Sequence, residues 1–223
     1  MEHVVVTRFS VPRPADSVTA GRHAEREWLE ERFSLFRRFY VPSVGRLGVP
    51  AILLCSSESA PLVADALGDL TWARVVVQDR WYGGWTGRPD QVLTRLDSDD
   101  ALHEGWFRQV EAADPDAEVV CSRCFLRLHL RKGKAYRYRR RVPSPLAAFR
   151  GGANPYAHDH EELPRHYRSA EVCGAYLLQV AHGGNLASTF PKPFRRRASL
   201  AVFGAFGLDP DDLGRLPVLR SGR

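Results

Sequence analysis

Three carboxylates lie within four residues in the segment Asp97-Ser98-Asp99-Asp100, directly after the apolar run Val92–Leu96. Carboxylates this close disfavour each other's ionisation unless a cation neutralises them. Asp97 and Asp99 are two residues apart, so in extended backbone both can face one hard cation. Mg²⁺ or Mn²⁺ would take its remaining ligands from water and phosphate oxygens. The alternative role is to cap the N-terminus of a following helix, but one aspartate is enough for that, so the cluster predicts a metal site.

Two further groups of titratable side chains occur later in the chain. His182 follows the apolar run Ala175–Ala181 and precedes two glycines, which favours a strand end where it could ligate the metal or contact phosphate. A histidine satisfied in the core or at the surface is the alternative. The stretch 158–163 is dense in titratable groups and could supply a general base, because a carboxylate near an acceptor hydroxyl can remove its proton. The alternative for this stretch is a solvated helix start.

The elements that must position these groups follow from the hydrophobic pattern. The expected strands are His3–Phe9, Ala51–Cys55, Ala73–Gln78, Val92–Leu96, Glu118–Ser122, a hairpin of Phe125–Leu130 with Ala135–Arg139, and Ala175–His182. The expected helices are Glu25–Tyr40 ended by Pro42, one capped by Ser57 or Ser59 and running through Leu67, Ala101–Ala112, and two short ones in the tail. Leu29, Phe33, Phe36 and Tyr40 share one helix face. This order predicts an α/β fold with one open sheet, parallel in its first half, mixed in its second, and flanked by helices.

Ligands of open α/β sheets bind at the carboxyl ends of the strands. Thr7, Arg8 and Phe9 end the first expected strand, so they face the same edge as the acidic cluster. The connection 79–91 is long for a loop and holds Trp81, Tyr82 and Trp85, which is typical of a functional loop.

The positive charge is concentrated in one segment. The chain carries a net charge of +6, and residues 119–158 hold ten Arg or Lys and no Asp or Glu. This segment predicts an anionic partner: a phosphate, a nucleic acid or an acidic surface.

The four cysteines favour buried free thiols over a zinc site, because Cys121 and Cys124 have metal-ligand spacing but no second pair accompanies them. The N-terminus lacks the pattern of a signal peptide, and no apolar run approaches the ~20 residues of a membrane span. We therefore expect a cytoplasmic protein without a transmembrane segment.

Four motifs occur in a recognisable order: His-Val-Val-Val-Thr-Arg-Phe at 3–9, Phe-Tyr-Val-Pro-Ser at 39–43, Thr-Arg-Leu-Asp-Ser-Asp-Asp-Ala-Leu at 94–102, and Leu-Gln-Val-Ala-His-Gly-Gly-Asn at 178–185. Together they resemble the rhamnosyltransferase family, which has the nucleotide-diphospho-sugar transferase (GT-A) fold. The similarity runs from residue 3 to about residue 190. The chain is short for that family, and the basic hairpin is not part of its motif set.

The resemblance implies a metal-dependent glycosyltransferase of the hexosyltransferase type. It would move a sugar, rhamnose by the family's label, from a nucleotide-diphosphate donor to a saccharide, lipid carrier, peptide or small molecule. The implied contacts to the sugar nucleotide are Thr7, Arg8, Phe9, Arg95 and Asp97, and the implied ligands of Mg²⁺ or Mn²⁺ are Asp97, Asp99 and His182. Asp159 or Glu161 would deprotonate the acceptor. The implied single GT-A-like domain, 1–223, has a nucleotide-binding half (about 1–100), an acceptor half (about 101–190) and a tail (191–223).

Two other function classes compete with this interpretation. One is a nucleic-acid-binding protein or a metal-dependent nuclease that uses the basic hairpin and the acidic cluster. The other is an inactive GT-A scaffold, which the retained Asp97, Asp99 and His182 disfavour. We expect no nucleic acid partner.

Overall fold

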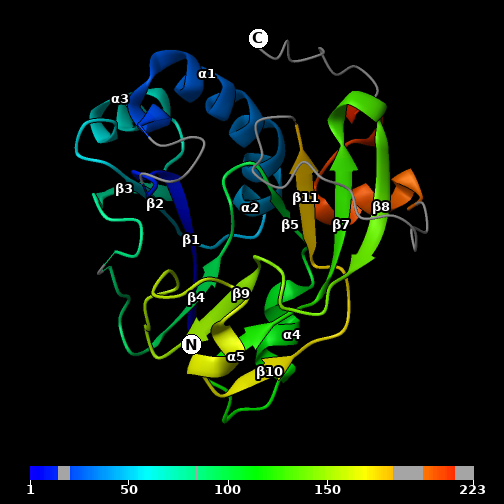
Figure 1. The fold of residues 1–223 in the computed structure, drawn as a ribbon. Coiled ribbons are helices and arrows are strands. Elements are labelled where there is room, and N and C mark those ends of the chain that lie inside the picture. Colours follow the sequence, from blue (N-terminus) through cyan, green and yellow to red (C-terminus); the bar gives the residue numbers. More distant parts are fainter. Residues whose placement is uncertain (15–20, 84, 183–197, 214–223) are drawn as a thin grey trace.

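The described residues form two sheets, and the larger one has seven strands; Figure 1 shows their arrangement. The structure is a computed structural model that describes residues 1–14, 21–83, 85–182 and 198–213. In spatial order the strands are β10 (Ser169–Glu171), β6 (Val119–Cys121), β9 (Ala147–Arg150), β4 (Gln91–Arg95), β1 (Glu2–Ser10), β2 (Ala51–Cys55) and β3 (Ala73–Val77). β4, β1, β2 and β3 run parallel, β9 is antiparallel to β4 and β6, and β10 is parallel to β6. The predicted mixed α/β fold with a parallel first half is confirmed.

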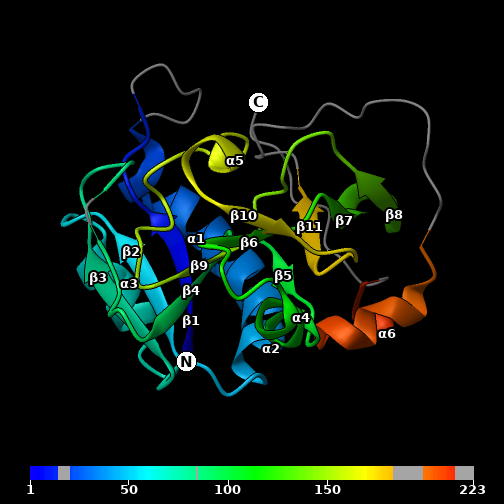
Figure 2. The same ribbon diagram turned by 90° about the horizontal axis from the view of Figure 1, so that it is seen from below.

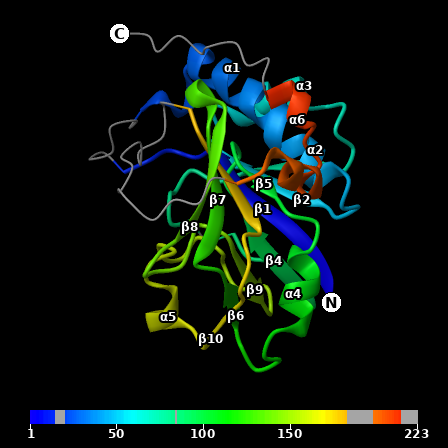
Figure 3. The same cartoon turned by 90° about the vertical axis from the view of Figure 1, so that its right-hand side faces the viewer.

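A second sheet stands beside the first, so the prediction of a single sheet is wrong. Its strands, in spatial order, are β5 (Ala101–Leu102), β11 (Leu177–Ala181), β7 (Cys124–His129) and β8 (Lys134–Arg139). This sheet has an apolar cluster of its own, in which Leu126 and Val180 pack with Phe203 and Phe206. The two phenylalanines belong to a 3₁₀ segment, Leu200–Phe206, which with α6 (Pro210–Leu213) lies beside α2 in Figure 3. The hairpin can therefore bury its apolar face without joining the larger sheet.

Strand β1 is buried on both faces, as its unbroken apolar run predicts. Val5 packs on the side of α1 (Arg26–Leu35), α2 (Val41–Gly45), α3 (Ala60–Ala66) and α4 (Trp106–Ala112). Val4 and Val6 pack on the opposite side with Tyr156 and with Leu163 of α5 (Leu163–His166). Figure 2 shows α5 across the sheet from α2 and α4.

The first long helix does not end at Pro42, contrary to the prediction. After α1 comes a π-helical turn, Phe36–Tyr40, in which the Val41 N–H donates to the carbonyl of Phe36. Pro42 then falls in the first turn of α2, where the wide preceding turn accommodates a residue without an N–H. The predicted apolar face is confirmed, since Phe9 of β1 packs on Phe36 with ring centroids 5.1 Å apart.

The helix expected from Ala101 begins only at Trp106, after Gly105 at its N-cap. Ala101 and Leu102 are instead strand β5, antiparallel to β11. Their full burial between apolar neighbours explains why sheet pairing overrides the helical pattern. The acidic cluster therefore does not cap a helix.

Ser59 is at the N-cap position of α3, as predicted, but its side chain does not make the expected capping hydrogen bond. Its hydroxyl bonds the hydroxyls of Ser10 and Ser56, and makes no capping hydrogen bond to α3.

All four cysteines are free; Cys55 and Cys121 are buried as expected, whereas Cys173 is exposed. In the described ranges no helix combines the length and apolar character needed to cross a bilayer.

Candidate functional site

A cleft of about 340 Å³ opens at the carboxyl ends of β1 and β4 and extends to β7 and β11. Its charged lining residues are Arg8, Arg13, Arg32, Arg95, Arg127, Arg140, Asp97, Asp99, Asp100, Asp159 and Glu161. Every predicted site residue except Thr7 borders this cleft, including Phe9 and His182. Thr7 is fully buried, and its hydroxyl donates to the Tyr40 hydroxyl at 2.9 Å.

Asp99 and His182 form a buried ion pair in the lining of the cleft. The distance from Asp99 Oδ2 to His182 Nε2 is 2.9 Å, and Glu31 lies 3.4 Å from His182 Nδ1. Burial alone would lower the pKa of His182, but the hydrogen bonds to Asp99 and Glu31 outweigh it and raise that pKa to about 9. Burial would raise the pKa of Asp99, yet His182 and Arg32 hold it at about 2.

The other two acidic side chains of the cluster have separate environments. Asp100 is buried, accepts a hydrogen bond from the Val180 N–H at 2.9 Å, and so fastens the acidic loop to β11. Burial and the neighbouring charges of Asp99 and Asp97 raise the pKa of Asp100 well above its usual value. Asp97 is half-buried and borders the cleft. The three carboxylates can coexist because each has a different environment. Asp99 is paired with His182, Asp100 resists ionisation, and Asp97 borders the cleft.

The Asp99–His182 pair makes stability depend on pH in the metal-free protein. The pKa of His182 is about 9 in the folded chain and about 6.5 in an unfolded one. The raised pKa of His182 therefore contributes fully below about pH 6.5, as long as Asp99 stays ionised, and this contribution, on the order of 3 kcal/mol, is lost as the pH rises through about 9. We expect the free energy of unfolding, measured by urea titration in EDTA, to fall between pH 6.5 and 9.

Two histidine variants separate this pair from other titrating groups. His182→Asn should remove the decline, whereas His103→Asn should retain it, because burial lowers the pKa of His103 and moves its titration below this window. An identical decline in His182→Asn and wild type would contradict the assignment.

Two arginines of the cleft lining contact the same aromatic ring. The guanidinium carbons of Arg8 and Arg95 lie 4.3 Å and 4.7 Å from the ring centroid of Tyr156, and Arg8 also lies 3.5 Å from that of Trp81. Arg95 is only 3% exposed. Among the described residues neither arginine forms an ion pair; Arg8 donates to the Trp81 carbonyl and Arg95 to the His158 carbonyl. Burial and the nearby Arg95 lower the pKa of Arg8 to about 10, so Arg8 is still a cation at pH 7.

The backbone of β1 explains how Arg8 reaches this position. β1 pairs with β4 only as far as Val6, and its register with β2 shifts between Arg8 and Ser10. Beyond Val6 the Tyr156 hydroxyl bonds the backbone of β1. It accepts from the Arg8 N–H at 3.2 Å and donates to the Val6 carbonyl at 2.9 Å. One side chain thus completes the end of β1 and supports both guanidinium groups.

The two candidate bases differ in their partners. Glu161 is ion-paired with Arg140, which also lies 3.1 Å from His160 Nε2. Burial together with Arg95 and Arg140 lowers the pKa of His160 to about 4, so its ring is neutral at pH 7. Asp159 is exposed and accepts from the Tyr82 hydroxyl at 3.3 Å. Asp159 is therefore the freer carboxylate.

The predicted metal ligands fit a hard cation through their oxygens. Asp97 and Asp99 offer carboxylates to the same cleft, and Mg²⁺ or Mn²⁺ binds with one or two carboxylates while keeping several waters. His182 holds Asp99 by a hydrogen bond in this structure. It can join as a ligand only after losing its proton, because metals bind neutral imidazole.

Sequence reasoning missed four arginines of the lining. Arg127 and Arg140 belong to the segment whose charge predicted an anionic partner, so that signal was usable. Arg13 follows β1, and Arg32 lies on the charged face of α1, where nothing distinguishes it from a solvated side chain.

No family model and no curated protein matches the chain. Among the solved structures that match is S. aureus TarS 1–349, with 12% identity, a TM-score of 0.39, and coverage of 81% of this chain and 60% of that chain. Another is the same TarS segment in complex with UDP-GlcNAc, with 12% identity, a TM-score of 0.43, and coverage of 86% and 62%. The chain thus spans about three fifths of these structures.

Proposed function

We propose that this protein is a glycosyltransferase that binds a nucleotide-diphosphate sugar in the cleft. The observation that carries the proposal is the pair Arg8 and Arg95, a half-buried and a buried guanidinium on one tyrosine ring without an ion-pair partner among the described residues. Buried charges are costly unless compensated, and guanidinium groups bind phosphate through two parallel hydrogen bonds. A diphosphate would supply the missing negative charge.

The aspartates of the cleft complement the two arginines. We propose that Asp97 and Asp99 hold Mg²⁺ or Mn²⁺, with His182 orienting Asp99. A divalent cation, when bound, neutralises charge that develops on a leaving diphosphate. The guanidinium groups of Arg8 and Arg95 stabilise the same charge.

Sugar transfer also needs a group that takes the acceptor's proton. By analogy with glycoside hydrolysis, the transferred sugar passes through an oxocarbenium-like state that the acceptor oxygen attacks. Asp159 borders the cleft and is held by Tyr82, so we assign the proton removal to Asp159 rather than to Glu161. Rhamnose is the sugar that the sequence resemblance indicates, and the acceptor is a saccharide, lipid carrier, peptide or small molecule.

A thermal-shift screen tests the proposal. Nucleoside diphosphates and hexose and 6-deoxyhexose nucleotides, rhamnose donors included, are screened with and without Mn²⁺. A ligand at ~100 times its Kd adds about 2.7 kcal/mol of stability. We expect a Mn²⁺-dependent shift with at least one nucleoside diphosphate. It should vanish in Asp99→Asn and persist in Asp116→Asn, which changes an exposed aspartate outside the cleft.

Oligonucleotides form the opposing arm of this screen. Part of the basic segment remains on the surface, where the exposed residues are Lys132, Lys134, Arg137, Arg139 and Arg141. The proposal would be contradicted if oligonucleotides raised the melting temperature in a strongly salt-dependent way and no nucleotide sugar did so. That result would indicate a nucleic-acid-binding protein instead of a transferase.

A further inference from the structure

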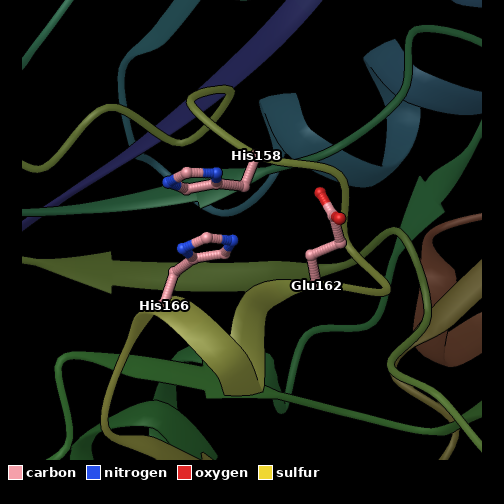
Figure 4. A group of neighbouring side chains, drawn as sticks. All are labelled: His158, Glu162 and His166. Carbon is pink, nitrogen blue, oxygen red and sulfur yellow. The ribbon is translucent and has the colours of Figure 1, made fainter.

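Three potential metal-binding side chains gather beside α5, outside the cleft lining (Figure 4). One donor atom each of His158, Glu162 and His166 lies within 4.8 Å of the other two. The two imidazole rings are stacked, with centroids 3.7 Å apart and planes 5° from parallel. In Figure 4 each ring has one nitrogen on the side that faces the Glu162 carboxylate. The three donors therefore border one small space.

These side chains are available to a ligand. Glu162 and His166 are exposed and His158 is half-buried. Within the described ranges none of the three side chains makes a hydrogen bond or an ion pair. The two histidine rings contact each other, and the His158 ring also lies 5.8 Å from that of Tyr167.

We propose that His158, Glu162 and His166 bind a transition-metal ion of the Zn²⁺ class. Two imidazole nitrogens and one carboxylate oxygen form a donor set that Zn²⁺ accepts, with water in the fourth position. Bonds of 2.0–2.2 Å in tetrahedral geometry place the ligand atoms about 3.3 Å apart. Coordination requires the two stacked rings to tilt out of parallel, because the lone pairs of parallel rings do not point at one ion. Rotation of the exposed Glu162 side chain can then bring its oxygen to that distance. This proposal does not rest on the glycosyltransferase function.

The backbone of the segment already holds the ligands near one another. The His158 carbonyl accepts from Arg95 at 3.2 Å, and the Glu162 N–H donates to the Asp159 carbonyl at 3.0 Å. Leu163, next to Glu162, is fully buried. Metal binding would therefore order mainly the three side chains, which lowers its entropic cost.

The same segment carries Asp159 and Glu161 to the cleft, between the first and last ligands. A metal that joins residues 158 and 166 would fix the ends of this segment. The site would thus stabilise the loop that holds the assigned base. It is chemically separate from the cleft, because imidazole ligands suit Zn²⁺ whereas the carboxylates of the cleft suit Mg²⁺ or Mn²⁺.

The test is a Co²⁺ titration followed by visible absorption, with Zn²⁺ as the competing ion, on protein without a histidine tag. Excess Mg²⁺ is present to occupy the carboxylates of the cleft. Under this condition we expect one Co²⁺ per chain, in a site from which Zn²⁺ displaces it. His166→Asn and His158→Asn should each weaken binding at least about 100-fold. His23→Asn, which changes a histidine of the cleft, and Asp99→Asn should leave it unchanged.

A measurement on the wild-type protein avoids the possibility that a variant loses binding because it misfolds. Zn²⁺ should shift the NMR signals of the His158 and His166 rings in the wild-type protein while leaving those of His103 in place. Zn²⁺ that fails to move the two ring signals, or an affinity that is the same in both cluster variants, would overturn the proposal. Loss of binding in Asp99→Asn with retention in His166→Asn would also overturn it and place the ion in the cleft.

Discussion

Asp159→Asn is expected to lower kcat for sugar transfer by about 10²–10⁴-fold, the usual contribution of a general base. Asparagine cannot take the acceptor's proton, but it keeps the shape of the side chain and its oxygen for the Tyr82 hydroxyl. The KM for the donor should therefore change little. Initial rates of nucleoside diphosphate release with a working acceptor measure both quantities.

Glu161→Gln is the matched control for this experiment. The Glu161 carboxylate is ion-paired with Arg140, so the guanidinium occupies an oxygen that would otherwise take the proton. We expect this variant to lose less than about 10-fold in kcat. A larger loss in Glu161→Gln than in Asp159→Asn would transfer the assignment to Glu161, and full activity in both would exclude this segment as the source of the base.

Arg8→Gln is expected to weaken binding of a nucleoside diphosphate by about 30–1000-fold, or about 2–4 kcal/mol. Arg8 lies 3.5 Å from the Trp81 ring centroid and beside Arg95, whose charge helps to lower the pKa of Arg8 to about 10. Two like charges held together raise the energy of the empty cleft, and an anionic ligand relieves it. Calorimetric titration gives the Kd directly.

Two arginine variants separate charge from geometry. Arg8→Lys keeps the charge but loses the planar fork and its stacking, so it should recover only part of the affinity. Arg88→Gln changes an exposed arginine paired with Glu2 and Asp90, and it should bind like the wild type. Equal affinity in Arg8→Gln and wild type would remove Arg8 from the binding site.

The strands with long apolar runs were predictable from the sequence, and the short ones were not. Ala51–Cys55 and the core of β1 are short, continuous runs of aliphatic and β-branched residues. Runs of this length and composition are typical of strands buried on both faces. β9 has only the sequence Ala-Ala-Phe-Arg and becomes a strand because β4 and β6 pair with it on both sides. Sheet pairing of that kind depends on tertiary context. The same reason explains why Ala101 and Leu102 form a strand in place of the predicted helix.

The candidate site was predictable where a residue follows a strand. Asp97, Asp99, His182 and Arg8 all lie at carboxyl ends of strands, and the topology brings them to one cleft as the edge rule implies. Arg32 and Glu31 were not predictable, because the helical pattern assigns charged residues to a solvated face. Their contacts with Asp99 and His182 depend on how α1 packs against the acidic loop.

Crystals grown with a nucleoside diphosphate and Mn²⁺ offer the most direct test of the central claim. We predict density for the diphosphate against Arg8 and Arg95, and an anomalous Mn²⁺ peak within ligand distance of Asp97 or Asp99. Diphosphate bound on the exposed face of the hairpin, or Mn²⁺ found only at His158, Glu162 and His166, would contradict the assignment of the cleft.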